Sequence, residues 1–238
     1  MIRIVVADSR GLAREGLTSL FAGHAEMLVI GQADNGLDSV RLAVEHEPDV
    51  VLMDIALPLL NGIEATRRIL ARSTRTRTIC IAADRSIARI RAAFNAGVSG
   101  YLSDSCSFRE LLDAIHAVCL QQVYLSPGIA HVLVNDYRAV QTGGVGQATA
   151  FVLLTPRERE ITQMLSEGHS TKDVAIRLHV SEKTVGTHRE HIMQKLNLRG
   201  IAELTRYALR EGLTSLEIPD HATVQPAPVS MLRRVRCV

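Results

Sequence analysis

Three aspartates of this chain have a type and position suited to phosphoryl chemistry. Asp8, Asp54 and Asp104 each stand at or just after the end of a short apolar run that is typical of a β-strand. The carboxyl ends of parallel strands meet at one edge of a sheet, where ligands bind. Carboxylate oxygens at such an edge can hold Mg²⁺. One hypothesis is therefore a magnesium-dependent phosphatase or phosphotransferase.

A catalytic role needs more than carboxylates. The sequence places no nucleophile–base pair and no glycine-rich phosphate loop with these aspartates. We therefore expect that the chain is not an enzyme and that it carries no cofactor. Asp8 and Asp54 are weak candidates for binding Mg²⁺.

A second group of polar residues follows helical spacing in the C-terminal part of the chain. On a wheel of about 100° per residue, Val185, Ile192 and Leu196 fall on one side of a helix that starts at Ser181. The opposite side carries a polar stripe: Lys183, Thr187, Glu190 and Gln194. Such a mixture of donors and acceptors can read base edges in the major groove of DNA.

The neighbours of the polar stripe suit the same role. Gly186 lies beside it and leaves room for close backbone approach, while Thr184, Arg189 and Lys195 flank it and can hold phosphates. In an isolated helix, an ordinary solvated face would be the better explanation. The local context of this helix favours DNA binding instead.

That context is a series of helix caps. Thr155 can cap a first helix, with Pro156 at its first position and Glu158 completing a capping box. Ser170 starts a short second helix that ends near Leu178, and the third helix follows after a tight connection. A short helix, a tight turn and a longer helix make a helix-turn-helix.

The first half of the chain alternates strands with helices. The predicted strands are Ile2–Ala7, Met27–Ala33, Asp49–Met53, Thr78–Ala82 and Gly100–Leu102. The predicted helices are Gly11–Phe21, Gly36–Glu45, Gly62–Ala71, Ser86–Ala96 and Phe108–Leu120. Five such repeats predict an α/β fold, a doubly wound (βα)5 parallel sheet with helices on both faces. The C-terminal part predicts an all-α, four-helix domain.

Composition limits the remaining classes. The net charge of +2 does not by itself indicate a nucleic-acid ligand. No stretch reaches about 18 consecutive apolar residues, so we expect no membrane span. The N-terminus meets an acid after a short apolar run, unlike a signal peptide. Four cysteines without close pairing suit reduced thiols. We therefore expect a cytoplasmic protein.

The C-terminal motifs resemble those of the LuxR-type helix-turn-helix. The resemblance runs through 151–213 and is carried by Leu154–Ile161, Gly168–Ala175 and Val180–Arg189. It implies a four-helix domain that binds inverted-repeat DNA as a homodimer, with the helix from Ser181 as the recognition helix. In that family the last helix, here Ile201–Glu211, commonly mediates pairing.

Residues 1–122 resemble the receiver domain of NarL/FixJ-type response regulators. The resemblance rests mainly on Ile4–Asp8, Arg14–Leu17, Pro48–Ile55 and Pro58–Gly62. It implies that Asp54 is the phosphoacceptor, served by an acidic pair, a hydroxyl, a lysine and Mg²⁺, with a sensor kinase as the input partner.

The chain departs from that receiver pattern at three positions. Ser9 replaces the second acid, Ala82 stands at the hydroxyl position and Asp104 stands at the lysine position. No other alignment supplies the lysine, because the first lysine of the chain is Lys172. Arginine is a poor substitute for a compact ammonium group. These departures predict a degenerate receiver.

The sequence thus predicts a receiver-like domain at 1–122, a linker at 123–150, a DNA-binding domain at 151–213 and a disordered tail at 214–238. The predicted function is a sequence-specific transcriptional regulator of double-stranded DNA that acts without ordinary aspartyl phosphorylation, its receiver taking input from another protein or ligand. The alternative is a conventional two-component response regulator that a sensor kinase phosphorylates on Asp54.

Overall fold

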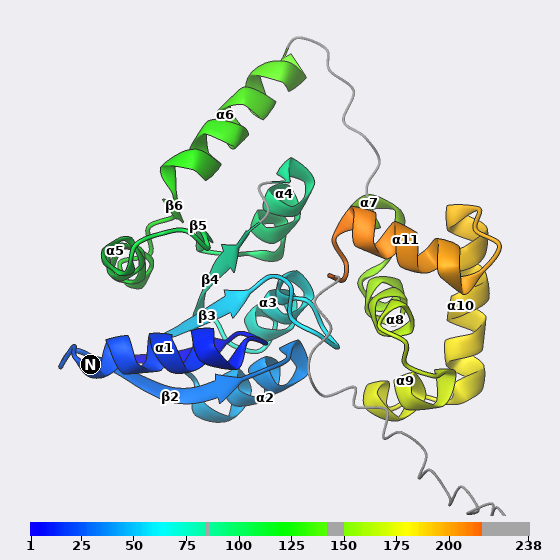
Figure 1. Ribbon diagram of the computed structural model, residues 1–238, viewed down its shortest axis with the longest axis horizontal. Coiled ribbons are helices and arrows are strands. Elements are labelled where there is room, and N and C mark those ends of the chain that lie inside the picture. The colour runs from blue at the N-terminus through cyan, green and yellow to red at the C-terminus, as the bar shows by residue number, and fades with distance from the viewer. Residues whose placement is uncertain (84–85, 142–149, 216–238) are drawn as a thin grey trace, which may run out of the picture.

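The computed structural model describes residues 1–83, 86–141 and 150–215 of the 238-residue chain. A six-stranded parallel sheet forms the N-terminal part, with the strand order β2-β1-β3-β4-β5-β6 (Figure 1). Its strands are β1 (Ile2–Ala7), β2 (Met27–Ala33), β3 (Val50–Asp54), β4 (Arg77–Ala82), β5 (Gly100–Ser103) and β6 (Tyr124–Leu125). The five predicted strands are confirmed. The sixth was not predicted.

Helices cover both faces of this sheet. They are α1 (Gly11–Ala22), α2 (Gly36–His46), α3 (Gly62–Leu70), α4 (Ile87–Ala96) and α5 (Phe108–Cys119). Phe21 of α1 and Leu111 of α5 share one buried cluster with strand residues, whereas α2, α3 and α4 contribute to the clusters on the other face. Since both faces are covered, the central strands are almost continuously apolar.

The helix starts follow from local sequence. The side chains of Asn35, Asn61 and Ser107 accept hydrogen bonds from backbone N–H groups in the first turns of α2, α3 and α5. Such caps satisfy donors that a helix start would otherwise leave without partners. Asn61 thereby fixes where α3 begins, eight residues from the strand end at Asp54.

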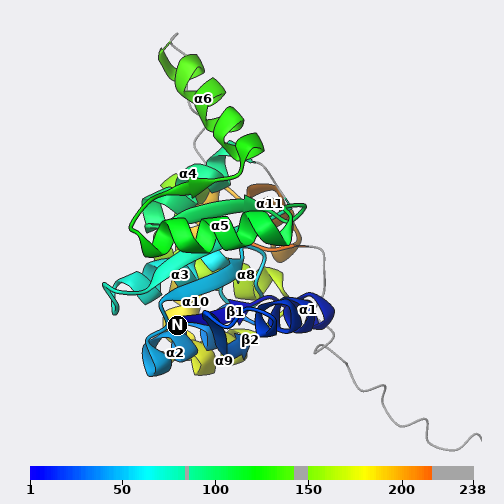
Figure 2. The ribbon, with the colours of Figure 1, turned by 90° about the vertical axis from the view of Figure 1, so that its left-hand side faces the viewer.

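The chain beyond α5 continues the sheet before it leaves it. β6 pairs with β5, and α6 (Pro127–Gln141) starts directly after it and projects away from the end of the sheet (Figure 2). Ile129 is fully buried against the receiver, and Arg91 of α4 pairs with Asp136. The start of the predicted linker therefore packs on the sheet domain. The glycine-rich part of that linker falls at 142–149, outside the described residues.

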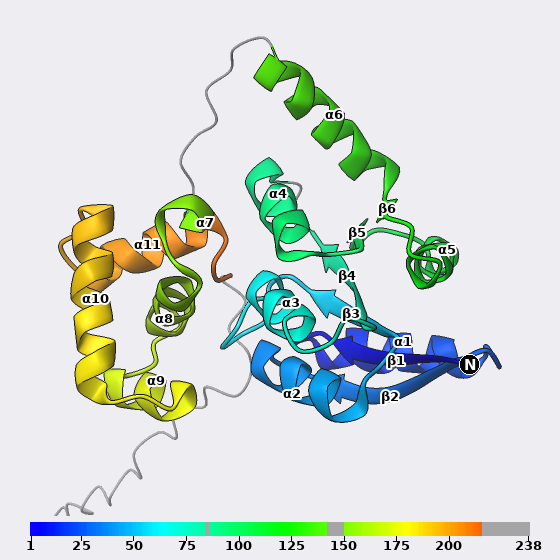
Figure 3. The same ribbon diagram turned by 180° about the vertical axis from the view of Figure 1, so that it is seen from behind.

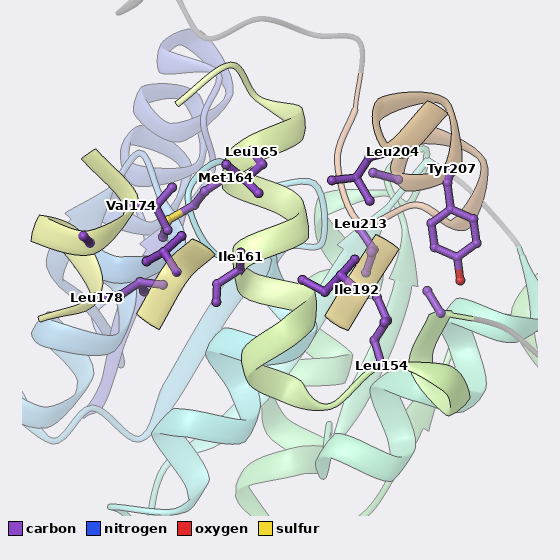
Figure 4. Close-up of a cluster of buried hydrophobic side chains, with 14 residues drawn as sticks. Leu154, Ile161, Met164, Leu165, Val174, Leu178, Ile192, Leu204, Tyr207 and Leu213 are labelled. Atoms are coloured by element: carbon purple, nitrogen blue, oxygen red, sulfur yellow. The ribbon is translucent and has the colours of Figure 1, made fainter. Parts of the chain in front are cut away.

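The C-terminal part is helical. It comprises α7 (Ala150–Leu153), α8 (Pro156–Ser166), α9 (Thr171–Leu178), α10 (Glu182–Leu196) and α11 (Ile201–Glu211). Figure 4 shows its core, where Ile161 and Met164 of α8 meet Val174 of α9, Ile192 of α10 and Leu204 of α11. The four predicted helices are confirmed, and the one-turn α7 precedes them.

The predictions on membrane spans and on the C-terminal tail can be compared with the described residues only. None of the described helices is long and apolar enough to cross a bilayer. The predicted disordered tail lies, from residue 216 on, outside the described residues.

Candidate DNA interface and receiver pocket

The first two helices of the C-terminal domain begin as their capping sequences dictate. Thr155 and Glu158 form a reciprocal capping box with Pro156 at the start of α8. Ser170 and Asp173 form a second box at α9. These caps satisfy the free N–H groups of both helix starts, so α8 and α9 are well defined by local sequence alone.

A tight turn joins α9 to the third helix. His179 takes the left-handed conformation with φ 53°, and the N–H of Val180 donates to the carbonyl of Ala175. The hydroxyl of Ser181 then accepts the N–H of Thr184 at 3.1 Å and starts α10. The turn and the cap together fix the direction in which α10 leaves α9.

The apolar side of α10 anchors it in the domain core. Val185 and Ile192 are fully buried there. The four residues of the polar stripe are exposed, as are Thr184, Arg189 and Lys195, and Gly186 is partly exposed. α10 lies on the side of the molecule away from the receiver sheet (Figures 1 and 3). The polar stripe is therefore exposed to solvent and not covered by the receiver.

A groove borders the same face of α10. It has a volume of about 500 Å³, and both Arg189 and Arg199 line it together with Gly186 and Glu190. Two guanidinium groups beside a partly exposed glycine can hold phosphate groups while the backbone approaches closely. Arg199 is a residue of this surface that the wheel analysis missed, because it lies beyond the helix.

Lys195 has a different position from the other flanking residues. Its ammonium group donates to both carboxylate oxygens of Glu158, at 2.7 and 2.8 Å. The pair ties the end of α10 to the capping box of α8. In this structure Lys195 therefore supports the position of α10. No local sequence pattern indicates this contact, because Lys195 and Glu158 are 37 residues apart.

This pair predicts a specific acid sensitivity. Burial alone would raise the pKa of the Glu158 carboxyl, but hydrogen bonds from Lys195 and Thr155 outweigh it and lower the pKa below its ordinary value. Because the pKa of this carboxyl is lower in the folded than in the unfolded state, where it is about 4.3, its ionised form stabilises the folded domain at pH values above about 4.3. This stabilisation is lost as the pH falls through the folded-state pKa. We expect Glu158→Gln to be less stable than the parent near neutral pH and to lose less stability on acidification.

Denaturant titrations monitored by circular dichroism between neutral and acidic pH measure this difference. Replacement of the exposed Glu15 by Gln is the matched control, because it removes a carboxylate that projects into solvent. If the free energy of unfolding changed with pH by the same amount in Glu158→Gln and in the parent, the stabilising role of the Glu158 carboxylate would be contradicted.

The residues of the predicted receiver site gather at the carboxyl edge of the sheet. Asp54, Ala82 and Asp104 line one pocket of about 170 Å³. Asp8 and Asp104 line a neighbouring pocket of about 360 Å³. Ser9 follows Asp8 in the connection to α1. The three aspartates therefore lie around one region, as the parallel topology predicts.

Comparisons with known proteins agree with this two-part architecture. A family model described as "Response regulator receiver domain" matches residues 4–116, and one described as "Bacterial regulatory proteins, luxR family" matches residues 152–208. The chain is 33% identical over 214 residues to the response regulator GacA of Pseudomonas aeruginosa, covering 90% of this chain and 98% of GacA. The chain belongs to the LuxR family of response regulators.

Similarity to this LuxR-family chain extends over nearly the full length of a second relative and over part of the chain in one solved structure. The oxygen regulatory protein NreC of Staphylococcus carnosus is 31% identical over 215 residues, covering 89% of this chain and 99% of NreC. A crystal structure of a LuxR-family response regulator from Aurantimonas sp. is 33% identical with a TM-score of 0.56, covering 58% of this chain and 99% of that one. The chain is thus a DNA-binding transcriptional regulator.

The fold agrees with a more distant neighbour. RcsB of Salmonella enterica serovar Typhimurium, solved bound to promoter rprA, is 18% identical with a TM-score of 0.57, covering 87% of this chain and 97% of that one. At this identity the likeness concerns the fold alone.

One residue of this regulator's receiver pocket was missed by the sequence analysis. Arg10 donates to both carboxylate oxygens of Asp8, at 3.1 and 3.0 Å, and its backbone N–H donates to the same carboxylate at 2.8 Å. Its Nη2 also lies 3.8 Å from Oδ2 of Asp54. A guanidinium group therefore lies between the two carboxylates that a receiver uses for its divalent cation.

The oxygen atoms at this site consequently do not provide the ligands that Mg²⁺ would have in the receiver pattern. The ion prefers several hard oxygen ligands in a near-octahedral arrangement. Here both oxygens of Asp8 bind Arg10, Oδ1 of Asp54 accepts the N–H of Ala56 at 2.9 Å, and Ser9 supplies no carboxylate.

Proposed function

We propose that this regulator binds inverted-repeat operator DNA as a homodimer, reads sequence with the polar stripe of α10, and does so without ordinary phosphorylation of Asp54. The observation that carries the proposal is the exposed polar stripe on a helix whose opposite side is fully buried. We further propose the cytoplasm as its location and an input protein or ligand, in place of a phosphodonor, as its signal.

The geometry of α10 supports the DNA-binding part. A recognition helix lies in the major groove with its first turns against base edges, and Lys183, Thr187 and Gly186 lie in those turns. In a dimer the two half-sites would be one helical turn apart, about 34–36 Å. The RcsB structure bound to a promoter is a fold neighbour in which DNA is the partner.

The receiver pocket supports the second part. Transfer of a phosphoryl group needs cations that offset the negative charge of the transition state. Asp104 adds a negative charge at the lysine position, and Ala82 removes the hydroxyl that would respond to a phosphoryl group. Arg10 neutralises the carboxylates internally. Such a receiver acts as a pairing and input module.

A conventional phosphorelay on Asp54 is the second candidate. One observation favours it: Asp54 ends β3 and lines the pocket at the carboxyl edge of the sheet. A sensor kinase would then be a partner. This candidate predicts labelling by a phosphodonor, which separates it from the proposal.

The DNA-binding proposal is tested by sequence selection with the purified full-length chain. We expect Thr187→Ala or Glu190→Ala to change the preferred base at individual operator positions, because their side chains project from the stripe toward base edges. Lys183→Ala should instead weaken binding to all sequences by a similar factor, because Lys183 stands at the helix start, where its long side chain can reach a phosphate group beside the bases. A loss confined to one base pair for Lys183→Ala, or no preference of the parent over random competitor at moderate salt, would contradict the proposal.

Gly186 predicts opposite changes in stability and binding. An added Cβ would have no neighbour within 4 Å, and the position lies inside a helix. Gly186→Ala should therefore stabilise the domain by about 0.5–1 kcal/mol. The same methyl group projects where DNA would approach, so we expect operator affinity to fall severalfold.

Thermal unfolding and operator titration of one Gly186→Ala preparation measure both effects. Gly168→Ala is the matched control, since an added Cβ there also has no neighbour within 4 Å but the backbone has φ +89°. That control should be destabilised by about 1–2 kcal/mol. Unchanged operator affinity for Gly186→Ala would show that α10 does not approach DNA at this residue.

A further inference from the structure

The first helix of the DNA-binding domain packs directly against the receiver. It contacts α3 and the loop between β3 and α3, which spans residues 55–61. We call this contact the α3–α8 seam. Its receiver side consists of Leu57, Leu59, Asn61, Glu64 and Arg68, and its other side consists of Arg159, Glu160, Gln163 and Glu167.

A buried ion pair holds the seam together. Nε of Arg159 donates to Oε1 of Glu64 at 2.6 Å, and the two side chains are only 4% and 1% exposed. Arg159 also donates to the carbonyls of Phe151 and Leu154, so its charge has several partners. Arg68 pairs with Glu160 beside it. A buried pair of this kind persists only in a specific geometry, so the docked arrangement is defined by particular residues.

Gln163 connects α8 to the backbone of loop 55–61. This fully buried side chain accepts the N–H of Asn61 at 2.7 Å and donates to the carbonyl of Leu57 at 2.9 Å. Glu167 also accepts the N–H of Leu59 at 3.0 Å. Gln163 of α8 and the C-cap residue Glu167, four residues apart, therefore bind three alternate backbone positions of the loop.

The same loop starts at the acceptor aspartate. The carboxylate of Asp54 accepts the N–H of Ala56 at 2.9 Å, and the carbonyl of Ile55 accepts the N–H of Gly62 at 3.0 Å. Ala56 and Leu57 are adjacent. A single peptide unit thus separates the group bonded to Asp54 from the group bonded to Gln163.

A second contact reaches the same pocket from the end of the DNA-binding domain. Arg89 of α4 lines the pocket of Asp54 together with Ser215, which follows α11. The guanidinium group of Arg89 packs so closely on Gly212 that an added Cβ would lie 1.7 Å from its Nε. Both α8 and the segment that directly follows α11 therefore touch structure around Asp54.

We propose that the state of the Asp54 carboxylate reaches the DNA-binding domain through loop 55–61 and Gln163. A change in the hydrogen bonding of Asp54 moves the N–H of Ala56 and, with it, the carbonyl to which Gln163 donates. α8 in turn holds α10 through the pair of Glu158 and Lys195 and through the shared core. Gln163 is thus a positioning residue between the two sites. The proposal rests on DNA binding by α10 but not on how Asp54 is altered.

A double-mutant cycle on operator affinity tests this coupling. The DNA is a genomic fragment selected by the purified full-length chain, and the substitution Asp54→Ala serves as the perturbation. We expect it to change the dissociation constant at least about fivefold in the parent, the lower end of typical coupling between sites. In a Gln163→Leu chain the same substitution should have almost no effect. Gln122→Leu, at an exposed position, is the matched control and should preserve the full effect.

The possible results distinguish coupling between the two sites from a general loss of folding or binding. Equal fold-changes in the parent and Gln163→Leu backgrounds would overturn the proposal, as would no effect of Asp54→Ala in the parent. If Gln163→Leu does not fold, Gln163→Met replaces it, since a thioether of similar length cannot donate to Leu57. Because coupling is reciprocal, operator binding should also change hydrogen exchange at the amides of Leu59 and Asn61 in the parent only. No DNA-dependent change there contradicts the proposal.

Discussion

The purified chain, incubated with a small phosphodonor and Mg²⁺, is expected to gain no phosphoryl group by intact-mass analysis. The physical reason is the charge around Asp54. A phosphorylated Asp54 would carry about two negative charges near Asp104, and like charges a few Å apart cost on the order of 1 kcal/mol even in a high-dielectric setting. Two guanidinium groups line this pocket, but Arg10 already donates to both carboxylate oxygens of Asp8, and Arg89 packs on Gly212.

A variant that restores the missing groups shows whether those groups limit the reaction. Ala82→Thr supplies the hydroxyl, Asp104→Lys supplies the ammonium and Arg10→Ala releases the carboxylates. We expect this triple variant to be labelled on Asp54, and a fourth substitution, Asp54→Asn, to abolish the label. A stoichiometric mass increase in the parent that is lost in its own Asp54→Asn variant would refute the prediction and favour the conventional phosphorelay.

The elements that the sequence predicted well are those specified by neighbouring residues. The boundaries of β1 and β2 follow from short apolar runs that end at polar or glycine-containing segments. The starts of α8, α9 and α10 follow from Thr155, Ser170 and Ser181, whose side chains bond within three residues. Local hydrogen bonds and side-chain period determine these features, so they are visible without tertiary structure.

The polar stripe was predictable for a similar reason. A helix of known start and period has a calculable exposed side, and the burial of Val185 and Ile192 agrees with it. Whether the stripe would be covered by the receiver could not be calculated, because domain docking depends on contacts between distant residues. The exposure of Thr187 and Glu190 in the docked chain is information that only the structure supplies.

What the sequence did not predict depends on tertiary contacts. β6 has two residues, too few for a periodic pattern, and it exists because β5 offers an edge. The partner of Lys195 is set by the crossing of α10 over α8. Arg10 lies two residues from Asp8, yet its role depends on β1 and β3 placing Asp54 within reach. In each case the deciding partner is far away in sequence or on another element.

The seam is the largest of these unpredicted features, and it predicts the last result. Replacing Glu64 by Leu should separate the two domains. Removing one partner of a buried ion pair typically costs about 3–5 kcal/mol, because the remaining charge stays in a low-dielectric environment without compensation. Glu64 also pairs with Arg67 at 3.4 Å, but Arg67 is already partly exposed to water; Arg159 is the buried charge left behind, and it can regain water only if α8 leaves α3. The destabilisation therefore takes the form of separation of the two domains. Its free energy cannot exceed the free energy with which the domains dock.

Small-angle X-ray scattering measures this outcome as an increase in the radius of gyration of the Glu64→Leu chain at constant helix content. The double variant Glu64→Leu with Arg159→Met should return to the parent dimensions, because apolar residues of similar volume can replace a buried pair. Arg68→Ala is the matched control: Arg68 is partly exposed, and its partner Glu160 keeps Arg157 at 3.1 Å, so no buried charge is left alone and the chain should stay docked. If Glu64→Leu kept the parent dimensions, the hydrogen bonds of Gln163 and Glu167 would have to hold the domains together without the buried charge.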